Sequence, residues 1–74
     1  MPPREKAVRV MEFEVCRRAQ DARWIVRLDN AIYGFYLDKE QALLDAVDAA
    51  RDALGRGREA QVWLRDRAST ARIL

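Results

Sequence analysis

Few residues of this chain have side chains that could carry out catalysis or bind a metal, and histidine is absent. Asp45, Asp48 and Asp52 recur at helical spacing, so their carboxylates could be imagined as ligands of a hard cation. That spacing is also the ordinary polar face of an amphipathic helix, which is convex and brings no further ligands together. Cys16 lacks a base that would convert its thiol to the nucleophilic thiolate. We therefore expect no catalytic residue, no metal site and no enzyme activity.

Length and composition narrow the class of protein further. The 74 residues suffice for one small domain, 50% of them are hydrophobic, and the formal net charge is only +2. The single cysteine excludes an internal disulfide, and residues 55–58, GRGR, lack the length and the Lys-Ser/Thr ending of a phosphate-binding loop. No apolar run approaches a membrane span or the centre of a signal peptide. We expect a cytoplasmic protein with no cofactor, no membrane partner and no evident small-molecule substrate.

The strands that must position any functional side chain follow from the periodicity of the sequence. Residues 9–18 and 23–28 alternate with period two around the short polar connection AQDA, which predicts an antiparallel hairpin. Turn residues at 29–30 precede a third strand, AIYGFYL, and residues 59–67 alternate again as a fourth strand. The final residues 68–74 are predicted to be either a short edge strand or a tail, and residues 1–8 are expected to be flexible.

Between the third and fourth strands the sequence predicts one amphipathic helix. Asp38 can cap it, with Gln41 where a capping box favours Glu or Gln, and Gly55 is suited to end it in the left-handed conformation. The apolar stripe expected to pack on the sheet consists of Leu43, Ala46, Val47, Ala50 and Leu54. The predicted fold class is α+β: a β-β-β-α-β layer over residues 9–67, mainly antiparallel, with one helix on one face. The crossover should set the fourth strand parallel to the third, whereas its pairing partner is left open.

The division of side chains between the two sheet faces decides which of them are accessible. Alternation places Trp24 in the core beneath the helix, and we place Phe35 there as well. Tyr33 and Tyr36 can fall on either face, because Gly34 permits a bulge that would shift the register between them. The opposite face of the sheet has no helix to cover it.

With these elements placed, the chain resembles a family of short bacterial proteins that form an uncharacterised domain family. Its pattern is a Trp-x-Val strand, a capped helix rich in alanine, then a glycine and a terminal strand. The matching segments are Trp24-Ile25-Val26, Asp38-Lys39-Glu40-Gln41-Ala42 with Ala46, Ala49 and Ala50, Gly57, and Ala60-Gln61-Val62-Trp63-Leu64. The chain departs from the pattern at Arg23, where a glycine often stands, and it lacks an Asp-Gly turn after the last strand. The element order is also similar to that of HicB-type antitoxins, which implies binding and inhibition of a small RNase.

The uncovered sheet face carries the candidate site. Its expected binding residues are Ile25, Arg27, Tyr36, Trp63, Arg65 and Arg67. Tryptophan and arginine are enriched at protein–protein hot spots, so this face favours a protein partner, most simply a homodimer through the open face or a sheet edge. The alternative is single-stranded RNA or DNA, with rings stacking on bases and arginines contacting phosphates. Glu12 and Glu14 on the same face could pair with the arginines, and the modest net charge also favours the protein partner.

Overall fold

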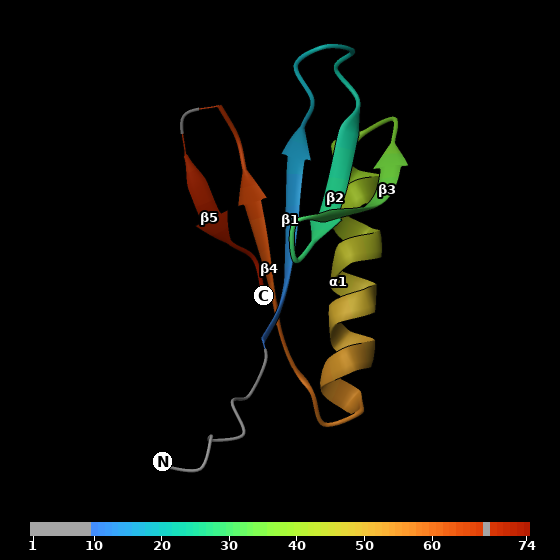
Figure 1. Cartoon of the computed structure of the whole chain (residues 1–74), viewed down its shortest axis with the longest axis vertical. Helices are drawn as coiled ribbons and strands as arrows, with labels where there is room; N and C mark the ends of the chain where they lie inside the picture. Colours follow the sequence, from blue (N-terminus) through green and yellow to red (C-terminus); the bar gives the residue numbers. More distant parts are fainter. Residues whose placement is uncertain (1–9, 68) are drawn as a thin grey trace, which may run out of the picture.

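The computed structural model describes residues 10–67 and 69–74 and shows two layers, a five-stranded sheet and one helix (Figure 1). In chain order the elements are β1 (Val10–Arg17), β2 (Trp24–Leu28), β3 (Ala31–Tyr36), α1 (Lys39–Gly55), β4 (Glu59–Arg65) and β5 (Thr70–Arg72). The predicted α+β fold class is confirmed. Residues 1–8, for which we expect flexibility, lie outside the described residues. No helix in the described part of the chain is long and apolar enough to span a membrane.

The strands lie in the order β3-β2-β1-β4-β5, so the first strand of the chain is the central one. β1 pairs antiparallel with β2 and parallel with β4, with Phe13 opposite Leu28 on one side and Val62 on the other. The helix therefore connects β3 to a strand on the other side of β1 from β2. β4 runs parallel to β3, as predicted. β5 pairs antiparallel with β4. Of the two alternatives for the C-terminal segment, the structure has the short edge strand.

Short polar turns connect the meander of the first three strands. Asp29 and Asn30 both have positive φ, 51° and 74°, as the two central residues of a type I′ hairpin turn require. The longer connection between β1 and β2 is closed by a backbone hydrogen bond from Arg18 N–H to the Arg23 carbonyl at 2.7 Å. The Arg18 guanidinium also pairs with the Asp21 carboxylate at 2.7 Å, and this contact lowers the pKa of Asp21 to about 2.

The core lies between α1 and the face of the sheet that carries Phe13, Val15, Val26 and Val62, all of which are fully buried. The helix contributes alanines to it, namely Ala42, Ala46, Ala50 and Ala53. The predicted stripe is therefore rotated: Leu43 and Val47 flank the alanines, and Leu54 is 41% exposed instead of buried. Small side chains of α1 thus face the sheet, and its leucines lie at the flanks of the helix or in solvent.

Both ends of α1 are defined by local hydrogen bonds. Asp38 is the N-cap, and its carboxylate accepts from the backbone N–H of Gln41 at 2.9 Å, as predicted. The end differs from the prediction, because Gly55 is still helical and the left-handed residue is Gly57, with φ of 83°. The predicted left-handed glycine is thus two residues too early.

A bulge in β3 decides the faces that alternation alone left open. Val26 pairs with Gly34 and Arg27 with Ile32, so Tyr33 is an extra residue between them. Tyr36 then lies opposite Trp24 on the helix face, and Phe35 lies opposite Ile25 on the uncovered face. The placement of Phe35 in the core is wrong: its side chain is 47% exposed. Tyr33 meets the core at its margin, where its ring packs edge-on against Phe13 at 5.8 Å.

Candidate functional site

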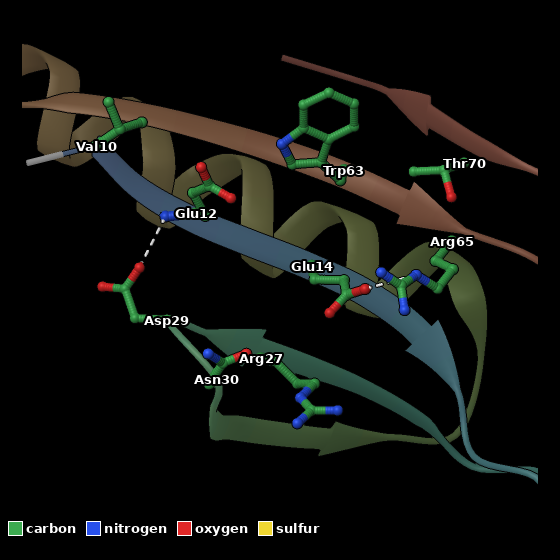
Figure 2. A pocket seen from close by; sticks show the side chains of 9 residues that line it. All are labelled: Val10, Glu12, Glu14, Arg27, Asp29, Asn30, Trp63, Arg65 and Thr70. Atoms are coloured by element: carbon green, nitrogen blue, oxygen red, sulfur yellow. Dashed lines mark hydrogen bonds and ion pairs between the residues drawn. The ribbon is translucent and has the colours of Figure 1, made fainter.

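The uncovered face of the sheet forms an open groove of about 530 Å³ (Figure 2). Its lining residues are Val10, Glu12, Glu14, Arg27, Asp29, Asn30, Trp63, Arg65 and Thr70. Three of the six expected binding residues, Arg27, Trp63 and Arg65, therefore lie along one groove. The parallel pairing of β4 with β1 is the reason, since it places Trp63 directly beside Glu14 and brings Arg65 beside Cys16.

The charges of the groove largely cancel and leave a small acidic excess. Three carboxylates line it, those of Glu12, Glu14 and Asp29, against the guanidinium groups of Arg27 and Arg65. Arg65 Nε lies 2.8 Å from Glu14 Oε2, and Figure 2 shows this pair across the floor. The Nε atom of Arg27 is buried without a hydrogen-bond partner in the described part of the chain. A groove with one more carboxylate than guanidinium disfavours a row of phosphates along its floor.

Trp63 is the one aromatic residue of the groove. It is half-buried, and its Nε1–H donates to Oε1 of Gln61 at 3.2 Å, so the polar edge of the indole is already satisfied. Figure 2 shows the ring standing above β4 on the groove side. The apolar part of the indole is suited to stacking or to apolar contact.

Ile25 occupies the predicted face but is not accessible. Only 7% of its surface is exposed, with Cys16 opposite on β1 and Phe35 opposite on β3. The guanidinium of Arg18 lies 5.0 Å from the centroid of the Phe35 ring. Ile25 is therefore buried although it lies on the uncovered face of the sheet. The exposed apolar surface beside it is that of Phe35.

Two further expected residues lie elsewhere, for different reasons. The β3 bulge turns Tyr36 to the helix face, where its hydroxyl donates to Oδ2 of Asp45 at 2.8 Å. Burial, and then the hydrogen bond to Asp45, raise the pKa of Tyr36 to about 12. Arg67 misses the groove because β4 ends at Arg65, and alternation cannot be extended into the connection that follows.

The side chains considered for catalysis or metal binding do not converge. Cys16 is partly buried, and burial followed by the nearby Glu14 carboxylate raises the pKa of its thiol, which opposes thiolate formation. Asp45, Asp48 and Asp52 lie on the exposed side of α1. Among residues 10–67 and 69–74 no group of three or more acidic, cysteine or histidine side chains could hold a metal ion.

The most exposed apolar surface lies at β3, outside the groove. Ile32, Tyr33, Phe35 and Leu37 are exposed by 52, 49, 47 and 84%, and we call these four residues the apolar edge. They account for four of the seven large hydrophobic residues that the described chain exposes. The signal is present in the sequence, because AIYGFYL contains neither a charge nor a proline, but the sequence pattern does not show that this strand lies at the edge of the sheet.

Comparison of the chain with protein-family models, with curated proteins and with solved structures gives no match.

Proposed function

We propose that this protein is a small non-enzymatic interaction module that self-associates by pairing β3 with the β3 strand of a second copy. The observation that carries the proposal is the apolar edge. β3 is the outermost strand on its side of the sheet, and its outer backbone groups face away from β2. An apolar strand in this position offers both a backbone ladder and side chains to a partner strand.

The two edges of the sheet differ in how far they resist such pairing. Natural edge strands are commonly protected by being short or by carrying charges or proline. β5 has only three residues and ends in Arg72, so it fits that description. β3 has six residues and carries no charge and no proline. The unprotected edge is therefore the one that also exposes the apolar side chains.

A second copy of the chain suits this edge for reasons of symmetry and charge. A two-fold axis perpendicular to the sheet would align the β3 strands antiparallel and keep both helices on the same side of a continuous sheet. Because β3 has no charged residue, the pairing would juxtapose no like charges along the strand. A large apolar side chain presents roughly 200 Å² when fully exposed, so the four partly exposed side chains of the apolar edge together offer on the order of 450 Å² per chain. This is more than half of the about 800 Å² per partner in a standard interface.

The test is the oligomeric state in solution, measured by sedimentation equilibrium over a range of concentrations. The full chain should be a dimer, and Ile32→Glu should dissociate it. Glutamate at this position can pair within the monomer with Arg27, its partner on β2, so the fold is retained. The matched control is Leu44→Glu, which makes the same kind of change at a 63% exposed site on α1 and should leave the dimer intact. A wild-type chain that stays monomeric at all concentrations would refute the proposal.

The antitoxin resemblance supplies a different occupant for the same edge, a small RNase. Binding of such a partner by a chain that is itself monomeric would favour this alternative over self-association. The groove supplies a third alternative, in which the partner covers Trp63. In that case Trp63→Ala would dissociate the dimer while Ile32→Glu would not.

A further inference from the structure

The strand order brings together two groups of arginines that are far apart in the sequence. Arg17 and Arg18 end β1 and begin the connection to β2, while Arg65 and Arg67 end β4 and begin the connection to β5. Because β1 and β4 are parallel neighbours, these two ends meet at the same end of the sheet, which is uppermost in Figure 1. An open cavity of about 450 Å³ lies there. Its lining residues are Cys16, Arg17, Arg18, Ala19, Ala22, Arg65, Asp66 and Arg67.

We call the four guanidinium groups of this cavity the arginine end. Arg18 is paired with Asp21, and Arg65 is paired with Glu14. Arg17 and Arg67 make no ion pair with any residue that the structure describes, and both are exposed. Asp66 is the single carboxylate of the lining, and it accepts from the backbone N–H of Arg67 at 2.7 Å. The cavity therefore has an excess of positive charge, in contrast to the groove beside it.

We infer that the arginine end binds the phosphate groups of a single-stranded nucleic acid. Guanidinium groups match the oxygens of phosphates in charge and in geometry. Arg65 lines both the cavity and the groove, and Trp63 stands two residues before it on the same face of β4, about 7 Å away along the strand. A strand whose phosphates occupy the cavity can thus bring a base to the Trp63 ring.

The carboxylates of the groove limit the path of such a strand. Glu12 and Glu14 belong to β1 and Asp29 to the turn after β2, so the acidic side of the groove is the side away from β4 and β5. The path that combines an aromatic ring with an unpaired guanidinium group runs along β4 from Trp63 toward Arg67. This inference does not depend on self-association through β3, which uses the opposite edge of the sheet.

The experiment is fluorescence anisotropy of a labelled single-stranded oligouridylate titrated with the full chain at several salt concentrations. Each phosphate contact on a single strand contributes about 0.7 to the slope of log affinity against log salt, so contacts to the two unpaired guanidinium groups, those of Arg17 and Arg67, predict about a sevenfold loss of affinity between about 50 and about 200 mM salt. Arg17→Ala combined with Arg67→Ala should remove most of that salt dependence. Trp63→Ala should weaken binding at least about fivefold without changing the slope, because stacking is not a salt-dependent contact.

The matched control is Arg51→Ala combined with Arg56→Ala, which removes the same charge from exposed sites on and just after α1. It should keep the wild-type slope. Three results would overturn the inference. One is the absence of binding at the lowest salt, and another is an equal reduction of the slope by the control pair. The third is displacement of the oligonucleotide by inorganic phosphate at matched phosphate concentration, which would assign the cavity to a small phosphate ligand.

Discussion

Gly34→Ala is the substitution that most directly tests how β3 is held against the helix. A Cβ atom built at Gly34 would lie 2.6 Å from the Tyr36 hydroxyl oxygen, 3.0 Å from Cζ and 3.1 Å from Cε1. The Tyr36 ring therefore lies across the space that only glycine leaves open. Its hydroxyl reaches Asp45 on α1 from this position, so a methyl group at residue 34 has to displace the ring and disturb that hydrogen bond.

Three contributions determine the expected change in the free energy of unfolding, two of them destabilising and one stabilising. Overpacking against a ring that must move costs about 1–3 kcal/mol. Loss of the Tyr36–Asp45 hydrogen bond, which is partly solvated, adds about 0.5–1.5 kcal/mol. Alanine lowers the entropy of the unfolded chain relative to glycine, which offsets about 0.4–1 kcal/mol. The expected net loss in the free energy of unfolding is about 0.5–4 kcal/mol, or roughly 3–25 °C in Tm for a domain of this size.

The assay is thermal and urea unfolding followed by circular dichroism. Gly55→Ala is the matched control, because a Cβ there meets no atom within 4 Å and the residue is helical, so this change should be neutral or slightly stabilising. In a double-mutant cycle, Tyr36→Phe removes the nearest clashing atom and should recover at least about 0.5 kcal/mol of the Gly34→Ala loss. A Gly34→Ala protein as stable as wild type, or a cycle without coupling, would refute the close packing of Tyr36 on Gly34.

Two further predictions concern pH and the helix cap. Because the pKa of Tyr36 is raised to about 12 in the folded state from 10.0, its stabilising contribution is complete below pH 10 and is lost as pH rises toward about 12. Alkaline unfolding of the Tyr36→Phe protein should show a flatter loss of stability over this range, and an unchanged pH profile would contradict the assignment. Asp38→Ala removes the acceptor for the Gln41 N–H and should lower the free energy of unfolding by about 1 kcal/mol in urea unfolding at neutral pH. Asp38→Asn should retain most of that energy, and equal losses in the two variants would rule out capping.

The sequence predicted the structure correctly wherever a single local rule determines it. Period-two alternation identified the inward residues of β1 and β2, and the Asp38 cap fixed the start of α1. Alternation failed at β3, because the extra residue Tyr33 moves each of the following residues of the strand to the opposite face of the sheet. For this reason Phe35 and Tyr36 lie on the faces opposite to those predicted. Residue type alone does not decide between the two faces, because an aromatic ring is compatible with either one.

The candidate sites depend on strand order, which alternation does not encode. Arg17 ends β1 and Arg67 follows β4, two strands that could each have paired elsewhere, and only the parallel pairing of β1 with β4 brings these arginines to one cavity. The same pairing places Glu14 against Arg65, which neutralises a guanidinium that the sequence alone would assign to ligand binding. Charge counts along the chain therefore cannot distinguish an arginine engaged in the fold from one available to a phosphate.

The composition of the core gives a physical reason for the proposed use of β3. The side chains that α1 buries are alanines, whereas Leu44 and Leu54 on the same helix are exposed. The intramolecular core of this small domain is consequently built from small helix residues, and much of its large apolar surface lies outside. Pairing of the apolar edge would bury Ile32 and Phe35, which the single helix cannot reach because they lie on the other face of the sheet. Self-association would then stabilise the fold by mass action, so the Tm of the wild-type chain should rise with protein concentration, whereas the Ile32→Glu chain should have a lower Tm that does not depend on concentration.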